Sequence, residues 1–128
     1  MNPAEIIITQ YRLGQRYFSE LELEGGIFDD QNLQDIIFEN CFLYSSFRRA
    51  NLQHAKFING NIKSCDFREA NLTKAHFENV SVEGALFAGA ITDGIYFNNN
   101  FAFSKVLTQT DFDEWLKNID ENEALPPS

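Results

Sequence analysis

Large apolar residues recur at every fifth position over the centre of the chain. The series is Phe47, Leu52, Phe57, Ile62, Phe67, Leu72, Phe77, Val82 and Phe87, with a break at Thr92 before Phe97. A small residue stands two places before most of them, as Ala50 stands before Leu52. A period of five fits neither the 3.6-residue repeat of an α-helix nor the two-residue repeat of a flat strand. The chain is therefore predicted to be a repeat protein.

The repeating unit is a small residue, Asn or Asp, Leu or Phe, and two polar positions. It is clearest in Ala50-Asn51-Leu52-Gln53-His54 and Ala70-Asn71-Leu72-Thr73-Lys74. On this pattern the chain resembles the pentapeptide-repeat family over roughly residues 15 to 105. The resemblance implies an all-β solenoid, a right-handed four-sided β-helix of about four coils, with a stack length of about 20 Å at the usual strand spacing.

A coil of four such units places residues twenty apart on the same wall. Upstream, Leu43 and Phe47 are only four apart, so Cys41-Phe42-Leu43-Tyr44 is interpreted as a four-residue unit and partners across it lie nineteen apart. The predicted core residues are Phe18, Phe28, Phe38, Phe47, Leu52, Phe57, Ile62, Phe67, Leu72, Phe77, Val82, Phe87 and Phe97. Asparagines align as well, in the columns Asn40-Asn59-Asn79-Asn99 and Asn32-Asn51-Asn71. They either hydrogen-bond along the stack or serve as turn residues.

A solenoid needs a cap at each end. Residues 1–14 are predicted to form an N-terminal capping helix that starts at Asn2-Pro3 and covers the first coil with Ile6, Ile7, Tyr11 and Leu13. The alternative is a short β-strand at 6–8. The repeat region is assigned to 15–107, an amphipathic helix to 108–120 and a disordered acidic tail to 121–128.

The C-terminal helix is predicted to begin with Thr110 as its N-cap and Asp113 at the third position. Its apolar face would consist of Phe112, Trp115, Leu116 and Ile119. This face would either close the last coil or, as the family resemblance implies for members that dimerise, form a homodimer contact. Just before it, the irregular stretch from Thr92 to Phe103 is either a decaying coil or a loop.

Negative charge lies at the two ends of the chain. The net charge is −9, yet residues 44–105 carry a net of +2. The acids of the first coil and of its junction with the second are Glu20, Glu22, Glu24, Asp29, Asp30, Asp35 and Glu39. Register predicts ion pairs of Asp29 with Arg48, Asp30 with Arg49 and Glu69 with Arg49. It also places Arg48 over Arg68, so that these like charges must splay or share Asp29. Glu20, Glu22, Glu24, Asp35 and Glu39, together with the apolar face of the C-terminal helix, are the candidate partner-binding residues.

Chemistry-bearing motifs are sparse. Cys41 and Cys65 occupy small inward positions and are expected to be buried, reduced thiols. His54 and His76 fall at outward positions in different columns, His54 with Lys74 and His76 with Lys56 and Tyr96. Neither histidine has a ligand at metal spacing, so no metal, cofactor or enzymatic activity is expected. With no leader and no long apolar run, a cytoplasmic protein without a membrane contact is expected.

The pattern therefore favours a non-catalytic protein-interaction module whose partner the residues do not name. The alternative, implied by the family resemblance, is a DNA mimic that binds a type II topoisomerase such as DNA gyrase. Duplex DNA carries a charge about every 1.7 Å, so a mimic of this length needs about twelve negative charges, whereas the middle of this chain is net positive. Direct nucleic-acid binding through Arg48, Arg49, Arg68 and Lys74 is not expected at a net charge of −9.

Overall fold

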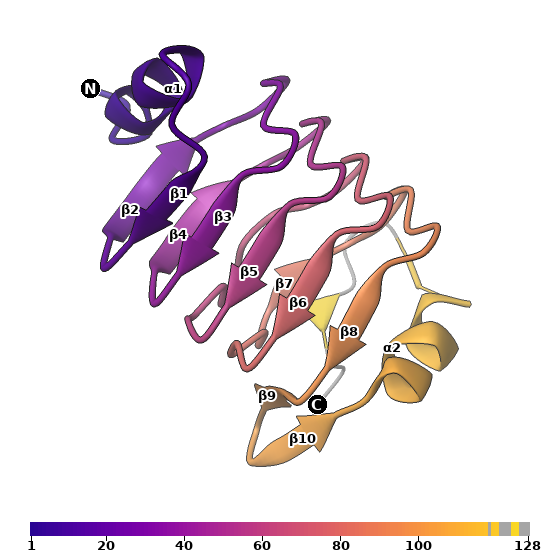
Figure 1. The fold of residues 1–128 in the computed structure, drawn as a ribbon. Helices are drawn as coiled ribbons and strands as arrows, with labels where there is room; N and C mark the ends of the chain where they lie inside the picture. Colours follow the sequence, from indigo (N-terminus) through magenta and orange to yellow (C-terminus); the bar gives the residue numbers. More distant parts are fainter. Residues whose placement is uncertain (118, 121–123, 126–128) are drawn as a thin grey trace.

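The computed structural model describes residues 1–117, 119–120 and 124–125. Over these residues the chain winds into a right-handed, four-sided β-solenoid of about four turns with a short helix at each end (Figure 1). The fold class predicted from the five-residue period is confirmed. No helix among the described residues is long and apolar enough to cross a membrane.

Each wall of the solenoid is named here by its inward residues. Wall A contains Phe18, Phe38, Phe57, Phe77 and Phe97; wall B contains Leu23, Leu43, Ile62, Val82 and Ala102; wall C contains Phe28, Phe47, Phe67 and Phe87; and wall D contains Leu33, Leu52, Leu72 and Thr92. The predicted core residues are all buried. Walls A and C are aromatic and face one another across the interior.

Wall A is a five-stranded parallel sheet. Its strands are β1 (Tyr17–Ser19), β3 (Ile37–Glu39), β5 (Lys56–Ile58), β6 (His76–Glu78) and β8 (Tyr96–Asn98). On wall B, β2 (Glu22–Ile27) pairs in parallel with β4 (Phe42–Ser46), and β7 (Ala85–Leu86) lies on wall C. Single parallel bridges such as that between Asn51 and Asn71 continue walls B, C and D.

The phenylalanine columns fill the interior in two directions. Along wall C, the rings of Phe28 and Phe47 lie 4.6 Å apart and within 1° of parallel. Across the interior, the rings of Phe67 and Phe77 meet edge to face at 5.6 Å and 90°. Both geometries are favourable for aromatic pairs because the ring edge is positive and the ring face is negative.

The backbone conformation at the corners favours polar residues at the last position of the unit. The last residue of most units has a positive φ, for example 58° at Arg49, 60° at His54 and 56° at Asn79. Asparagine tolerates this conformation better than most residues. Along the first asparagine column one amide step is made, from Asn79 Nδ2 to Asn59 Oδ1 at 3.2 Å. In the second column each Oδ1 instead accepts from the amide two residues on, as Asn51 does from Gln53 at 3.1 Å, so the turn interpretation holds there.

The four-residue unit is confirmed. Phe42 pairs with Asn61, nineteen residues on, whereas Ser46 pairs with Asp66, twenty residues on. In the first coil Gly25 is the extra residue, at a φ of 76°, where the register shifts between β2 and β4. As a result β4 runs continuously past the corner.

The N-terminal helix α1 spans Glu5–Arg12 and does not start at Pro3 as predicted. The side chain of Asn2 binds the edge of β2, accepting from Ile27 N and donating to Ile27 O, both at 2.8 Å, and its Oδ1 also accepts from Ala4 N at 3.1 Å. The residues that cover the first coil are Ala4, Ile7, Ile8 and Tyr11. The predicted Ile6 and Leu13 are exposed, because the helical period places them on the other face.

The last coil is more regular than expected. Thr92 is half-buried on wall D and causes no bulge, because Ile91 N donates to Ala70 O and Ile95 N to Thr92 O as in earlier units. The chain then forms a hairpin of β9 (Asn100–Ala102) and β10 (Lys105–Leu107), followed by helix α2 (Gln109–Leu116). Of the predicted disordered tail, Ala124–Leu125 forms β11, antiparallel to β7. Residues 121–123 and 126–128 lie outside the described part.

Removing one ring from the core tests the stacked columns. Phe57→Ala should lower the free energy of unfolding by about 3–5 kcal/mol, because Phe57 contacts rings in both its own column and the facing one. The measurement is urea denaturation. Phe42→Ala, at a side chain that is 56% exposed, is the control and should cost less than about 0.5 kcal/mol. Equal losses in the two variants would contradict this account of the core.

Candidate interaction surfaces

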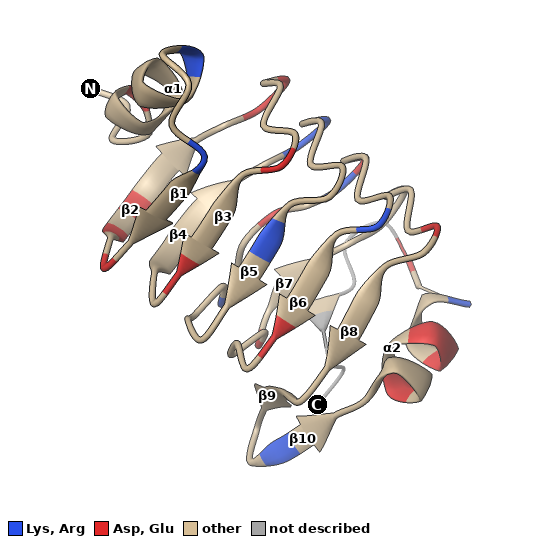
Figure 2. Cartoon of the chain, viewed as in Figure 1, with Lys and Arg blue, Asp and Glu red and all other residues tan. Residues whose placement is uncertain are grey.

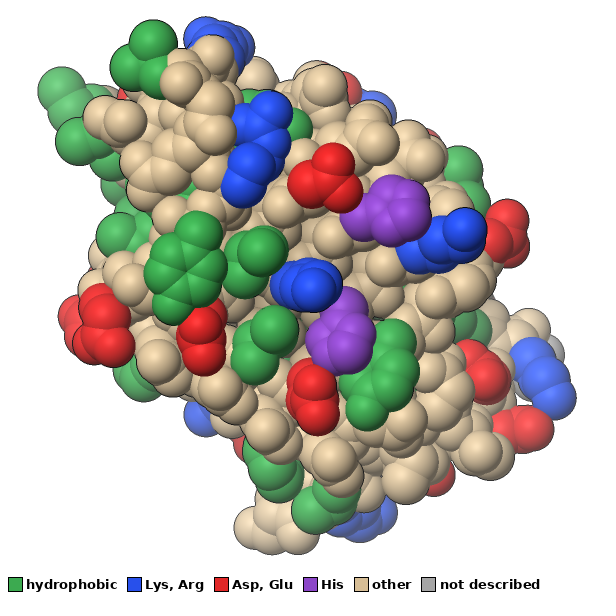
Figure 3. Space-filling model, viewed as in Figure 1, with side chains coloured by type: hydrophobic (Ala, Val, Ile, Leu, Met, Phe, Trp, Pro, Cys, Tyr) green, Lys and Arg blue, Asp and Glu red, His purple; other side chains and the backbone are tan. Residues whose placement is uncertain are grey.

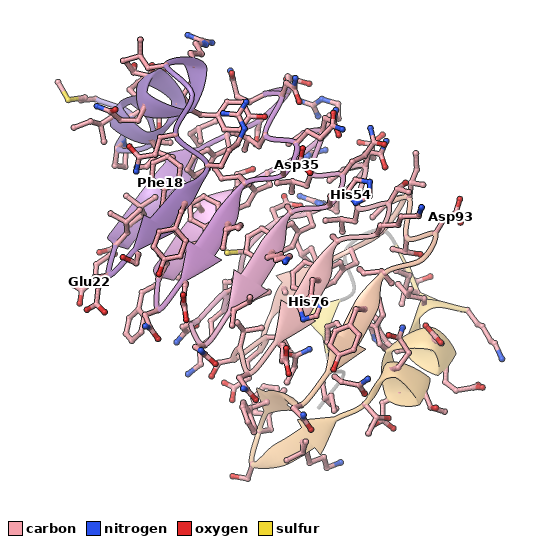
Figure 4. The ribbon with its side chains drawn as sticks, in the orientation of Figure 1. Phe18, Glu22, Asp35, His54, His76 and Asp93 are labelled. Carbon is pink, nitrogen blue, oxygen red and sulfur yellow. The ribbon has the colours of Figure 1, made fainter. Side chains whose placement is uncertain are left out.

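The five acidic candidate residues do not form one patch. Glu22 and Glu24 lie on wall B, Glu39 lies on wall A, and Glu20 and Asp35 occupy corners. Figure 4 shows Glu22 and Asp35 far apart on the stack, and Figure 2 shows acidic and basic residues interspersed along the coils. Glu22 and Glu24 share wall B, and the backbone amide of Glu20 donates to the carbonyl of Glu39 in the next coil at 3.3 Å.

Glu39 is held within wall A. Its Oε1 accepts from the Tyr17 hydroxyl at 2.7 Å, and its Oε2 accepts from Asn59 Nδ2 at 3.4 Å. The hydrogen bond to Glu39 raises the pKa of Tyr17 above its ordinary value. This carboxylate therefore stabilises the register of wall A and is less available than the other acids.

The predicted ion pairs are partly wrong. Asp30 does pair with Arg49, at 2.8 Å from Nε, and the pKa of Asp30 is lowered by that hydrogen bond. Asp29, however, accepts from the Ser46 hydroxyl at 2.5 Å and from the Arg48 backbone amide at 3.0 Å, and does not pair with the Arg48 guanidinium. Its carboxylate lies over the backbone of the next coil, which places it beside these donors.

Glu69 also has a different partner from the one predicted. Arg48 Nη2 lies 3.8 Å from Glu69 Oε1, whereas Arg49 is already engaged by both oxygens of Asp30. Arg48 and Arg68 share Asp66, and not Asp29, at 4.0 and 2.8 Å from Asp66 Oδ2. The two stacked guanidinium groups are accommodated because a carboxylate stands beside both.

Burial would raise the pKa of Asp66, but hydrogen bonds from the Arg68 side chain and backbone outweigh it and hold the pKa below its ordinary value. The Asp66–Arg68 pair is the most buried of the ion pairs among the described residues, with the two side chains 15% and 17% exposed.

Helix α2 closes the last coil. Phe112 is fully buried, stacked on Phe97 at 4.1 Å and edge to face with Phe87 at 5.2 Å. Trp115 and Leu116 are half-buried against the same core, and Ile119, predicted on this face, lies beyond the end of the helix. The apolar face proposed for a partner is thus largely occupied by the solenoid itself.

The N-cap of α2 is Thr108 and not Thr110. Thr108 Oγ1 accepts from Asp111 N at 3.2 Å, and Asp111 Oδ2 accepts from Thr108 N at 2.9 Å. This reciprocal capping box begins two residues earlier than predicted. Both threonines precede an aspartate three residues on, so spacing alone did not distinguish them.

The cysteines and histidines lie where the register predicted. Cys41 and Cys65 are buried free thiols, and burial raises the pKa of Cys65 to about 12. His76 lies between Lys56 and Tyr96 on wall A; its ring stacks on Tyr96 at 4.1 Å, and its Nε2 lies 2.9 Å from Glu78 Oε1. His54 occupies a corner, and Figure 3 shows both histidine side chains on one face of the molecule among charged and apolar side chains. Over the described residues, no group of three His, Cys, Asp or Glu side chains is placed to hold a metal ion.

Wall B carries a surface that the sequence analysis did not identify. Phe42, Tyr44, Phe101 and Phe103 are 41–57% exposed on it. A groove of about 420 Å³ is lined by Phe42, Leu43, Tyr44, Asn61, Lys63, Ser64, Glu83, Gly84 and Phe103. The available signal was the presence of aromatic residues at the polar positions of the repeat, on either side of Leu43 and Ala102.

Comparisons with known proteins match the repeat and the fold. The family model described as "Pentapeptide repeat region" matches residues 31–102, more than half of the chain. No curated protein sequence matches. Among solved structures, a trypsin-treated variant of QnrB1, a plasmid-mediated fluoroquinolone resistance protein, is similar with a TM-score of 0.61 and 20% identity over 70% of this chain and 50% of that one.

Two further solved structures are similar. A second trypsin-treated variant of QnrB1, with a different substitution, has a TM-score of 0.59 and 21% identity over 66% of this chain and 44% of its own. The pentapeptide-repeat protein Rfr23 from the cyanobacterium Cyanothece 51142 has a TM-score of 0.37 and 21% identity over 74% and 75%. The chain thus spans about half the length of the QnrB1 structures that it matches.

The capping box gives a matched pair of threonine variants. Thr108→Ala should lower the free energy of unfolding by about 1 kcal/mol, because the amide of Asp111 loses its acceptor. Thr110→Ala, two residues on and exposed, should change it by less than about 0.5 kcal/mol. Urea denaturation of both measures this, and the reverse order would show that the helix starts at Thr110.

The Asp66 pair predicts a pH dependence of stability. Because the pKa of Asp66 is lowered in the folded state, its contribution is present above the ordinary carboxyl pKa of about 3.9 and is lost as pH falls through the folded pKa. The stability difference between the protein and Asp66→Asn should therefore be larger at pH 7 than at about pH 3. Thermal unfolding across this range measures it, with Asp93→Asn at an exposed corner as the control. A difference that stays constant with pH would contradict the ion pair.

Proposed function

Because this chain belongs to the pentapeptide-repeat family, we propose that it is a non-catalytic module that binds a protein partner in the cytoplasm. The observation that carries the proposal is the filled interior. Each wall turns its large side chains inward, where the aromatic columns are 0–6% exposed, so the surfaces left for function are the flat outer walls. Free thiols at Cys41 and Cys65 accord with a reducing compartment.

The outer walls suit a protein partner in their mixture of side chains. Ion-paired charges, such as Lys63 with Glu83 at 3.7 Å, alternate with exposed apolar residues. Protein interfaces combine apolar anchors with polar surroundings in this way. A homodimer through α2 is the less favoured arrangement, because Phe112 already packs on Phe97.

A topoisomerase-binding DNA mimic is the second candidate, and the likeness to QnrB1 is the observation that favours it. That likeness, at 20% identity, is one of fold. Against it, acids along the stack are paired with bases, as Asp30 of the first coil is with Arg49 and Asp66 with Arg68. The walls therefore lack the continuous negative charge that an imitation of duplex DNA requires.

Affinity capture followed by reconstitution tests the proposal. The intact protein, immobilised through its N-terminus, should retain a protein that rebinds after purification with a Kd in the micromolar range or tighter, measured by calorimetry. In parallel, addition in large excess to a DNA gyrase supercoiling assay should leave the rate unchanged. Dose-dependent inhibition of gyrase would favour the DNA mimic instead. Repeated recovery of nucleic acid alone would contradict both the protein-binding module and the DNA mimic.

A further inference from the structure

Wall B carries two adjoining grooves that share Phe42 and Tyr44. The first is the groove between the second and last coils, ending at Phe103. The second, of about 340 Å³, is lined by Glu22, Leu23, Glu24, Phe42 and Tyr44. Together they run along the solenoid axis from the acidic first coil to the terminal hairpin. We call the two grooves, which adjoin at Phe42 and Tyr44, together the wall B groove.

The groove results from unequal side chains in one column. The outward positions of wall B align Glu22, Phe42, Asn61, Ser81 and Phe101. Small and polar residues in the third and fourth coils leave a depression between aromatic residues of the second and last coils. Gly84 lines it, and an added Cβ there would come within 2.9 Å of Ser64 Oγ. The depression is therefore part of the repeat itself and not a gap between loosely packed elements.

Phe103 occupies a backbone conformation that does not suit it. It and Ser104 form the two-residue turn between β9 and β10, with φ values of 49° and 65°. Such hairpin turns favour Asn and Gly, and a bulky residue there is strained. The side chain is 53% exposed, so core packing does not explain it. Strain at a single exposed aromatic residue that lines a groove points to a role in binding.

Electrostatics indicate which kind of segment fits. Glu22 and Glu24 are exposed at one end of the groove, and neither makes an ion pair within the described part of the chain. Figure 4 shows Glu22 pointing away from the ribbon. The charges in the middle, Lys63 and Glu83, already neutralise each other at 3.7 Å. The groove thus offers two free carboxylates followed by apolar and aromatic surface.

We infer that the wall B groove binds a linear segment of a protein partner in which Lys or Arg is followed by apolar residues. The basic side chain lies against Glu22 and Glu24, and the apolar residues contact Phe42, Tyr44 and Phe103. Three coil spacings of about 4.8 Å separate the second and last coils, which four or five extended residues span. This inference rests on the proposed function, since it assigns the surface through which the module binds.

An arrayed library of twelve-residue peptides tests the occupant. The intact protein should retain peptides in which Lys or Arg precedes Leu, Ile or Phe by one to five positions. It should prefer them to peptides that are otherwise identical but carry acidic residues in place of the basic ones. The Kd of the best peptide is then measured by fluorescence anisotropy at low and moderate salt, and binding should weaken as salt rises.

Two pairs of variants test the surface. Phe103→Asn should weaken the best peptide about tenfold or more while leaving the Tm unchanged or raised, because Asn suits the turn. Its control is Ile91→Asn, which removes a residue 49% exposed on wall D, in a column otherwise made of asparagines. The double change Glu22→Lys with Glu24→Lys should weaken binding similarly. The single change Glu20→Lys, at a corner whose conformation Lys74 also adopts, should have much less effect.

Each other result overturns the inference. Retained peptides that bind all variants equally would place the interaction elsewhere and leave the proposed function standing. If no basic apolar peptide is retained, the groove does not bind a segment of this kind. If affinity capture also fails, the proposed function is contradicted as well. A dimer in sedimentation that Phe103→Asn dissociates would assign the groove to a second copy of this chain. A Tm lowered by Phe103→Asn would show that the Phe103 side chain stabilises the fold, which would contradict a role confined to binding.

Discussion

The structure depends on the stacking of phenylalanine rings along two opposite walls. A coil of about twenty residues buries little on its own, and its inward rings find partners only in the coils above and below and across the interior. Ring separations of 4.6–5.2 Å along wall C match the spacing that the backbone hydrogen bonds impose on successive coils. On wall C, side-chain packing and backbone pairing thus agree in distance, whereas the rings of wall A lie 4.8–6.1 Å apart and some are tilted.

Because the inward side chains fill the interior, the chemistry that each wall presents to solvent is set by the positions that face outward. On wall A these positions hold a hydrogen-bonded surface in which Tyr17, Glu39 and Asn59 are linked. On wall C they hold the cluster in which Arg48 and Arg68 share Asp66. Wall B differs, because its outward aromatic residues border a groove. The same scaffold therefore presents walls of different chemistry.

The fold could be predicted from the sequence because the period of five is a property of the backbone path. Register followed from it, including the short unit at Tyr44, and so did the burial of Phe57 or Cys65. Side-chain partners could not be predicted in the same way. Asp29 and Glu69 lie beside the predicted arginines, but a long side chain reaches several acceptors, and the choice depends on which are already engaged. Helix starts were missed for a related reason, since Thr108 and Thr110 have the same local spacing.

The wall B groove could not be predicted from clusters of charge along the chain. Acids of the first coil and its junction with the second are distributed over different walls by the corners, as Glu22 on wall B and Glu39 on wall A show. Residues far apart in the chain, such as Phe42 and Phe103, are brought to one wall. A search by column, and not by segment, would have found the aromatic pairs on either side of Leu43 and Ala102.

The terminal hairpin has a consequence for growth of the solenoid. A parallel coil that ended in an open strand would offer the next molecule the same template that each coil offers its successor, and the rods would join into filaments. Here β10 runs antiparallel to β9, and β11 runs antiparallel to β7. The outermost strands at these edges therefore run opposite to the direction that a further parallel coil would need. Reversal of chain direction at the last turn therefore opposes the addition of a further parallel coil along these two edges.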